Sequence, residues 1–379
     1  MLPNNHPNEY RLISLSGGGY RAALFNAGAL RALDGAGLLD DSNVIVNAVS
    51  GSAIPAMLWE QYLAAHKNKA APAWPETSLL SLVSKTPRFG GQYNWQLRGG
   101  LFRATRAWHG FLEKWWSSLE QLPQGLGNEP KFFVEALDYQ RGQLWLYCRG
   151  RFSPATRDLL RDRTAFLNIK VSKMAAVAAA TAFPLAFQGL PVTDEKNRRV
   201  ASIRDAGLID NVAIMPLLHM IKKDARGETF GTVKHWIISN AGKPLPVTVG
   251  FEGTQTWTVG NSQLVGSLGL FDRISRLTGD LAQPQFEKLL TDILHEYVGI
   301  HFTAVAIGVS IGDDKPWISK AEGDPEPARM RTALEFVRRS LALSVMSEGA
   351  QAMSKALVAE RLMTQKQQED VQRFLSELA

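Results

Sequence analysis

The chain has 379 residues, of which 45% are hydrophobic and 21% charged. This is the composition of a globular protein with ample material for a core, and it excludes a disordered or low-complexity chain. The net charge of +6 is a mild excess that fits nucleic acid, anionic lipid or no charged partner. Cys148 is the only cysteine, which excludes an intramolecular disulfide and favours a reducing compartment.

The localisation signals of the chain are weak. Residues 1–6 carry neither the basic nor the apolar region of a secretory signal, so we expect a cytoplasmic protein. The uncharged stretch 174–193 is long enough for a membrane span, but alanine dominates it and two prolines interrupt it. We therefore predict a buried helix followed by a loop there.

The first motif is a glycine-rich turn near the N-terminus. An apolar run at 12–15 leads into Gly17, Gly18 and Gly19. The order strand, glycine turn, helix points free backbone N–H groups and a helix N-terminus at one place, where a negative group would bind. The helix is predicted from the spacing of Leu24, Ala27, Leu30 and Leu33.

Three negative groups would suit this turn: a triphosphate, a dinucleotide pyrophosphate or an oxyanion formed in acyl transfer. The triphosphate is excluded because no Gly-Lys-Ser/Thr follows the glycines. Gly17, Gly19 and Ala22 satisfy the dinucleotide pattern G-x-G-x-x-G/A. That pattern also needs an acidic residue after the second strand, and Ser50 stands there instead.

Ser50 lies in a sharp turn of small residues. The apolar run 44–49 ends in Ser50-Gly51-Ser52, and a helical pattern from Ile54 to Tyr62 follows. This is the form of a nucleophile elbow, in which a strained serine backbone makes the hydroxyl project. Ala48 and Ser52 stand where the pattern G-x-S-x-G has its two glycines.

The third motif is an acid at the end of a strand. Asp205 follows the run 200–203 and precedes Ala206-Gly207, at a position where α/β folds place catalytic groups. Asp210 is a second candidate for a catalytic base. We predict that Asn211 caps the helix indicated by Ile214, Leu217 and Leu218.

Taken in order, these motifs resemble those of the patatin-like phospholipases. Residues 16–22 are similar to the cytosolic phospholipase A branch, and the alanine-rich run 175–184 resembles the helix and bend before the family's aspartate. The resemblance covers roughly residues 10–242. One departure concerns Asp205: the family usually has Asp-Gly-Gly or Asp-Gly-Ala, whereas this chain has Asp-Ala-Gly. Because alanine resists positive φ, the turn after the acid is expected to differ.

The resemblance implies a fold, a mechanism and a set of site residues. The fold would be a three-layer α/β/α arrangement with a central, mostly parallel sheet. A dyad without histidine would use Ser50 as nucleophile and Asp205 as base. Backbone N–H groups of Gly17 to Gly19 would form an oxyanion hole, and Arg21 would bind a substrate phosphate. No metal ion or cofactor is expected.

The remaining sequence suggests how the chain is organised. We predict a catalytic core over residues 1–250 with a helical, basic and aromatic insertion near 82–125. Residues 251–379 would form an extension packed on the core, with one strand at 303–309 and a helical C-terminus at about 329–346 and 351–378.

The expected partner is a phospholipid membrane surface, reached by peripheral association. Basic residues alternate with tryptophans in the 82–125 insertion, which suits a headgroup interface but equally suits aromatics packed on the core. Nucleic acid is not expected, because zinc-ligand spacing and RNA-binding aromatic motifs are absent from the sequence. A homo-oligomer is left open.

Four functions are therefore carried forward. The first is a lipid acyl hydrolase of the phospholipase A or lysophospholipase type, acting on glycerophospholipid esters. The second is a nucleotide-binding protein that uses the glycine turn as a phosphate cradle. The third is an α/β-hydrolase with a triad, because Ser50, Asp205 and His235 occur in the required chain order. The fourth is a catalytically idle patatin-like fold used for binding.

Overall fold

The computed structural model describes most of the regular elements of the chain. The described residues are 9–67, 74–87, 104–119, 130–154, 171–183, 187–193, 199–207, 209–218, 232–241, 301–307, 334 and 336–378.

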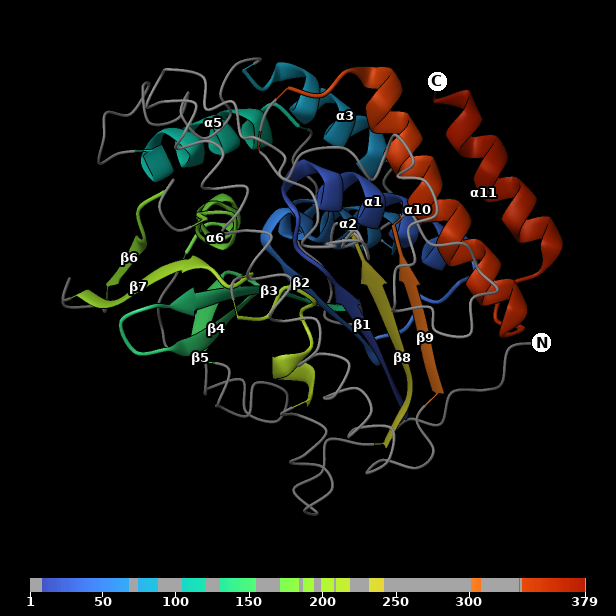
Figure 1. Cartoon of the computed structure of the whole chain (residues 1–379), viewed down its shortest axis with the longest axis horizontal. Helices are drawn as coiled ribbons and strands as arrows, with labels where there is room; N and C mark the ends of the chain where they lie inside the picture. Colours follow the sequence, from blue (N-terminus) through green and yellow to red (C-terminus); the bar gives the residue numbers. More distant parts are fainter. Residues whose placement is uncertain are drawn as a thin grey trace, which may run out of the picture.

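Parallel strands form the centre of one sheet, in the order β3-β2-β1-β8-β9 (Figure 1). Strand β2 is a nearly continuous apolar run and is buried along its whole length, as strands covered on both faces are. The bounds of the five strands are β1 (Glu9–Leu15), β2 (Val44–Val49), β3 (Lys131–Asp138), β8 (Thr232–Asn240) and β9 (His301–Ala306).

Antiparallel strands complete the sheet beyond β3. One edge of β3 pairs with β4, which pairs with β5, and β7 pairs with both β3 and β6. Because the parallel strands lie at its centre and the antiparallel ones beyond β3, the central sheet is mostly parallel, as the resemblance implies. The bounds of these strands are β4 (Gln143–Cys148), β5 (Arg151–Pro154), β6 (Leu190–Thr193) and β7 (Arg199–Asp205).

Successive side chains of a strand point to opposite faces of the sheet, and here both faces are buried. Ile13 and Val46 belong to the larger core on the helical face, whereas Leu12 and Ile45 belong to a second cluster on the other face. Segment 212–218 covers this second face with Ile214, Leu217 and Leu218. The predicted α/β class, with helices against a central sheet, is therefore confirmed.

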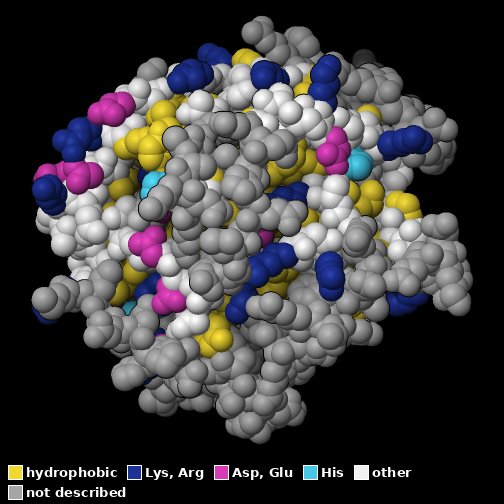
Figure 2. Space-filling view, turned by 180° about the vertical axis from the view of Figure 1, so that it is seen from behind, with side chains coloured by type: hydrophobic (Ala, Val, Ile, Leu, Met, Phe, Trp, Pro, Cys, Tyr) yellow, Lys and Arg dark blue, Asp and Glu magenta, His cyan; other side chains and the backbone are white. Residues whose placement is uncertain are grey.

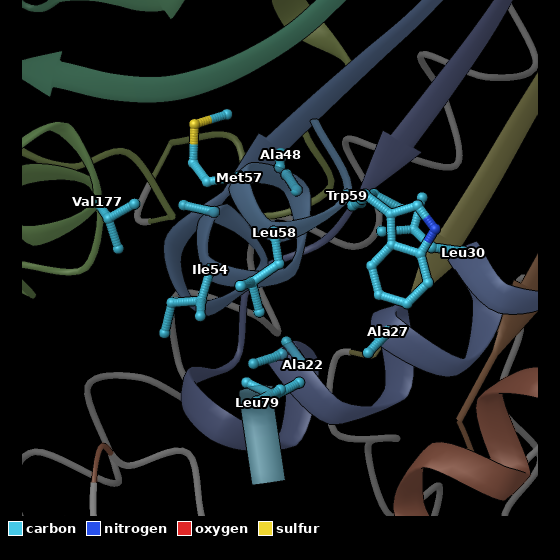
Figure 3. Packing of buried hydrophobic residues seen from close by; sticks show 14 of the residues in the cluster. Ala22, Ala27, Leu30, Ala48, Ile54, Met57, Leu58, Trp59, Leu79 and Val177 are labelled. Atoms are coloured by element: carbon cyan, nitrogen blue, oxygen red, sulfur yellow. The ribbon is translucent and has the colours of Figure 1, made fainter. Parts of the chain in front are cut away.

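The helical face carries helices from both ends of the chain (Figure 1). Figure 3 shows side chains of α1, α2 and β2 packed together there, among them Leu30, Leu58 and Ala48. The helices are α1 (Gly19–Gly35), α2 (Ala53–Lys67), α3 (Pro75–Lys85), α5 (Ala104–Ser117), α6 (Lys173–Ala180), α10 (Arg339–Ala359) and α11 (Gln365–Glu377).

The C-terminal helices differ from the prediction in their bounds. One helix, α10, runs through the gap expected near 347–350, and the break comes at 360–364, where Arg361 has a φ of 58°. Thr364 then begins α11 with a capping box to Gln367. The strand predicted at 303–309 is found at 301–306. The boundary predicted at residue 250 lies outside the described residues and stays a prediction.

Helix α11 is held to the core through a buried arginine of α1. Arg31 donates from Nε and Nη2 to the carboxylate of Glu76, at 2.5 and 2.9 Å. Its guanidinium carbon also lies 4.5 Å from the ring centroid of Phe374 in α11 and 4.7 Å from that of Trp74. Through an ion pair and cation–π contacts, Arg31 thus joins helices α1, α3 and α11.

The described tryptophans of the 82–125 insertion face inward. Trp108 and Trp115 of α5 are buried in the core, and the Trp108 indole donates to Thr181 Oγ1 at 2.7 Å. Of the two interpretations of the insertion, a headgroup interface or aromatics packed on the core, Trp108 and Trp115 support packing on the core. Residues 88–103 and 120–129 of the insertion lie outside the described residues. Among the helices that are described, including α6 with its alanines, none has the length and apolarity of a membrane span.

Helices α1 and α10 cross at two glycines. A Cβ at position 28 would lie 1.9 Å from the Met346 carbonyl oxygen, and one at position 349 would lie 2.0 Å from the Phe25 carbonyl oxygen. No side chain fits between backbones this close.

We therefore expect Gly349→Ala to lower the free energy of unfolding by about 1–3 kcal/mol, the usual cost of overpacking. Helix propensity alone would favour alanine by about 1 kcal/mol, so the sign of the effect is diagnostic. Urea unfolding measures it. The matched control is Gly110→Ala in α5, where a Cβ would meet nothing within 4 Å. Equal stability of the two variants would contradict the close crossing.

Candidate active site

The site lies where two strands meet end to end along β3. Residues 134–135 of β3 pair with both β2 and β4, and residues 136–138 pair with both β4 and β7. Hence β2 and β7 share the edge of β3 opposite β4. Val49 is opposite Glu135 and Asp205 is opposite Ala136, so the ends of the two strands converge.

Ser50 occupies a strained turn between β2 and α2. Its φ is 54°, in the left-handed region that non-glycine residues rarely adopt. Gly51 is required beside it, because a Cβ there would lie 1.9 Å from the carbonyl oxygen of Gly19. The predicted elbow geometry is therefore present without the leading glycine, whose place Ala48 takes in β2.

The Ser50 hydroxyl donates to Asp205 Oδ2 at 2.7 Å. The Gly207 backbone N–H donates to Asp205 Oδ1 at 2.8 Å, which fixes the rotation of the carboxyl group. Burial raises the pKa of Asp205 to about 7, and the hydrogen bonds from Ser50 and Gly207 oppose that rise. A base that is half ionised near neutral pH is suited to proton transfer.

The alanine after Asp205 does not disturb the turn. Ala206 is absent from the residues with positive φ, and its methyl group is buried against Val49, Leu137 and Ala213. The difference expected from the Asp-Ala-Gly sequence is therefore not found: this turn needs no positive φ at position 206, so an L side chain fits.

The three N–H groups of the glycine turn differ in whether they are hydrogen-bonded within the fold. Gly17 N–H donates to the Asn211 carbonyl oxygen at 2.8 Å and is used within the fold. Within the described part of the chain, the N–H groups of Gly18 and Gly19 have no hydrogen-bond partner. Both residues have positive φ, 142° and 58°, and they form the N-terminus of α1. Two of the three predicted oxyanion donors are thus available to a ligand.

Arg21 lies behind the glycine turn. Its side chain is 2% exposed, and Nε donates to the Ala241 carbonyl oxygen at 2.9 Å, which joins α1 to the end of β8. Nη2 would lie 3.3 Å from a Cβ at position 18, so the guanidinium is next to the turn. This position contributes positive charge at the turn, and the predicted contact with a phosphate stays a prediction.

The roles of Asp210 and Asn211 differ from those predicted. Asp210, not Asn211, caps the following turn, because its carboxylate accepts from the N–H groups of Val212 and Met215 at 3.3 and 2.6 Å. Asn211 instead lies in the site, with Oδ1 only 2.5 Å from where a Cβ of Gly17 would be. Two adjacent polar residues are equal candidates for a cap in the sequence, so only the fold separates them.

Two buried polar residues beneath the site had no role in the sequence analysis. Asn47 Nδ2 donates to Glu135 Oε2 at 2.8 Å and to the Ala213 carbonyl oxygen at 3.0 Å. Burial and the nearby charge of Asp210 raise the pKa of Glu135 well above its usual range, which favours the protonated form of this carboxyl group. The available signal was a polar residue inside an apolar strand, at Asn47 in β2 and Glu135 in β3.

His235 lies far from the dyad. In the sheet, His235 of β8 is opposite Arg11 of β1, and Arg11 is opposite Val44 of β2. His235 is therefore level with the start of β2. Ser50 follows six residues later, about 20 Å along the sheet at 3.3 Å per residue. The triad alternative is not favoured. Within the described ranges, no three His, Cys, Asp or Glu side chains are grouped as metal ligands.

Comparison with known proteins finds likeness only in structure. The sequence matches no known family model and no curated protein. The structure is similar to VipD from Legionella pneumophila, with 13% identity, a TM-score of 0.35, and coverage of 93% of this chain and 67% of VipD. It is also similar to human GIVD cytosolic phospholipase A2, with 12% identity, a TM-score of 0.36, and coverage of 60% and 42%.

A second structure of the human phospholipase, in complex with a methyl gamma-linolenyl fluorophosphonate inhibitor and terbium chloride, gives 17% identity and a TM-score of 0.26. That match covers 39% of this chain and 24% of the human protein. The chain thus spans less than half of either phospholipase structure. The likeness is one of fold in outline, and the function proposed below rests on the chain's own residues.

The raised pKa of Asp205 predicts how stability depends on pH. The carboxyl titrates near 4 in the unfolded chain and near 7 in the folded one, so the stability that it contributes below pH 4 is lost as pH rises through 7. Asp205→Asn is neutral throughout. Its advantage over the parent should grow by about 1.4 kcal/mol per pH unit between pH 5 and 7, and stay constant above.

Urea unfolding at pH 5, 6, 7 and 8 measures this difference. Any hydrogen bond gained or lost by the amide shifts all four values equally, so only the slope is informative. A difference independent of pH would show that Asp205 is not held in a charge-disfavouring site.

Proposed function

We propose that the chain is a lipid acyl hydrolase that cleaves carboxylic ester bonds of glycerophospholipids through a Ser–Asp dyad. The observation that carries the proposal is the 2.7 Å hydrogen bond from Ser50 to Asp205, made by a serine with positive φ. The adjacent N–H groups of Gly18 and Gly19 complete a nucleophile, a base and an oxyanion site.

In the acylation step, Ser50 Oγ attacks the ester carbonyl carbon while its proton passes to Asp205 Oδ2. The carbonyl oxygen becomes an oxyanion, which the N–H groups of Gly18 and Gly19 stabilise; each such donor is typically worth ~10²–10³ in rate. When the intermediate collapses, the bond to the leaving alcohol breaks, and that oxygen takes the proton from Asp205.

In the deacylation step, water takes the place of the alcohol. Asp205 accepts a proton from the water as its oxygen attacks the acyl carbon, and the Ser50–acyl bond then breaks. Ser50 Oγ regains the proton and the free fatty acid leaves. One carboxylate therefore serves both steps, because it is restored to the ionised form after each.

The nucleotide-binding alternative has a weaker basis. Asp205 and Ser50 stand beside the glycine turn, where a bound phosphate would meet a carboxylate. Gly17 N–H is already bonded to Asn211, which removes one phosphate-binding donor. A bound phosphate would be repelled by the Asp205 carboxylate. An oxyanion that forms as Asp205 takes up a proton avoids this repulsion.

A membrane phospholipid is the substrate class that we propose, with peripheral association at a membrane surface. Ile209 and Met215, which flank the loop after the dyad acid, are among the most exposed large apolar side chains of the described residues, at 47% and 42%. On the face seen in Figure 2, dark-blue Lys and Arg side chains are interspersed with magenta Asp and Glu and with yellow apolar side chains. The exposed apolar pair together with the net charge of +6 suits an anionic lipid surface.

Removal of either dyad residue should abolish hydrolysis. We expect Ser50→Ala and Asp205→Asn to release no fatty acid from mixed phospholipid vesicles above background while keeping a cooperative unfolding transition. A fluorophosphonate probe should label the parent and not Ser50→Ala. His235→Ala is the control, and it should keep activity within about tenfold, whereas a triad enzyme would lose on the order of 10⁴. Full activity of Ser50→Ala would end the proposal, and no labelling of the parent would favour a non-catalytic fold.

Arg21 gives a test of the phospholipid claim. If its guanidinium pairs with the lipid phosphate, Arg21→Ala should reduce turnover of a phospholipid more than turnover of an uncharged p-nitrophenyl ester. The expected gap is about 1.5–3 kcal/mol, or roughly 10- to 150-fold in kcat/KM. An equal loss on both substrates would show that Arg21 is structural or shapes the oxyanion loop, and the phosphate-recognition claim would be withdrawn. Arg21→Lys keeps the charge and controls for the loss of buried volume.

A further inference from the structure

A fully buried asparagine joins the glycine turn to the nucleophile turn. Asn26 lies in α1, two turns of helix beyond Gly19, and its side chain is inaccessible to solvent. Its Nδ2 donates to the Ser16 carbonyl oxygen at 3.1 Å and to Ser52 Oγ at 2.6 Å. Its Oδ1 accepts from Ser239 Oγ at 2.5 Å.

The bonds close a ring around the residue that precedes the glycines. The Ser52 hydroxyl, which accepts from Asn26, donates to the same Ser16 carbonyl oxygen at 2.5 Å. Ser16 Oγ in turn accepts from the Ala241 N–H at 2.6 Å, and Ser16 N–H donates to the Ser239 carbonyl oxygen at 3.0 Å. Three strand ends, those of β1, β2 and β8, are therefore fixed to one helical side chain.

This arrangement is specific in a way that a buried apolar residue would not be. A buried amide is costly unless it is hydrogen-bonded, and here both amide hydrogens and the oxygen have partners. The bonds go to Ser16, which directly precedes the glycine turn, and to Ser52, which is two residues after Ser50. The network therefore sets the distance between the donors of the turn and the serine hydroxyl.

We propose that Asn26, acting together with Ser52, is a positioning residue that aligns the N–H groups of Gly18 and Gly19 with the Ser50 hydroxyl. The inference rests on the proposed function, because alignment matters only if an oxyanion forms there. Oxyanion donors act at 2.7–3.1 Å from the developing charge, so a small shift of the turn is costly. A misplacement of about 1 Å reduces a rate by about 10²-fold.

The test compares Asn26→Ala and Ser52→Ala with the parent on a soluble p-nitrophenyl ester. We expect kcat to fall by about 10²-fold, with KM changed by no more than about twofold and the midpoint of the pH profile unmoved, because Asp205 is untouched. Ser52→Ala removes a single hydroxyl, so it serves where Asn26→Ala folds poorly. The double variant should lose little more than the worse single variant, because both residues hold the same carbonyl oxygen.

Hydrogen exchange supplies a readout that does not depend on activity. In segment 16–21, the N–H groups of Ser16 and Gly17 are hydrogen-bonded to the Ser239 and Asn211 carbonyl oxygens. Their exchange, followed by mass spectrometry of a peptide that covers the segment, should rise at least about tenfold in both variants, while β4 and α10 keep the parent's rates. Tyr147→Phe is the matched control: it removes a buried hydroxyl from β4, which pairs with neither β1 nor β2.

The outcomes separate the two proposals. An unchanged kcat, or exchange that rises throughout the protein rather than in segment 16–21, would overturn the positioning role of Asn26. If exchange rises locally while the parent shows no hydrolysis that depends on Ser50, the network aligns the turn and the proposed hydrolase function is wrong. A local rise together with the loss of kcat supports both.

Discussion

The site depends on the meeting of two strands of opposite direction along one edge of β3. Strand β2 ends at Val49 and β7 ends at Asp205, at adjacent positions of their common partner. Parallel strands alone would place all their C-terminal residues in a row, about 5 Å apart from strand to strand. An antiparallel partner running head-on instead brings the acid directly to the serine, at 2.7 Å. The pairing of Ser50 with Asp205 thus follows from sheet topology, and the backbone N–H of Gly207 orients the carboxyl group.

Burial raises the pKa of Asp205 and, in doing so, lowers the stability of the folded protein near neutral pH. A carboxyl group without water holds its proton more tightly, and for Asp205 this moves the pKa from an acidic value to about 7. Burial and the nearby Asp210 also raise the pKa of the neighbouring Glu135 well above its usual range, which disfavours a second negative charge beneath Asp205. Burial raises the pKa of Asp210 as well, and hydrogen bonds from the backbone N–H groups of residues 212–215 oppose that rise. Burial thus raises the pKa of all three carboxyl groups, and the hydrogen bonds that oppose the rise differ from one group to the next.

The sequence predicts the parts of the site that local patterns encode. Ser50 and the three glycines stand in turns between a strand and a helix, and the resemblance to the patatin-like phospholipases implies the pairing of Asp205 with Ser50. What it misses depends on contacts between distant segments. Gly17 resembles its two neighbours in sequence, yet its N–H is used by Asn211, nearly two hundred residues away. Asp210 makes the cap predicted for Asn211 for the same reason, and α10 passes through its expected break because small residues there fit against α1.

Polar residues in the core explain why the turns stay aligned in a protein rich in small side chains. Alanines and glycines allow close approach, as at Gly51 and Gly19, but their short side chains supply little directional contact. Hydrogen bonds supply direction. On one face of the sheet Asn26 joins three strand ends, and on the other Asn47 binds the segment that carries Asp210 and Asn211. Because an unsatisfied buried amide is costly, each asparagine penalises any displacement of its partners, and the site between them is held from both sides.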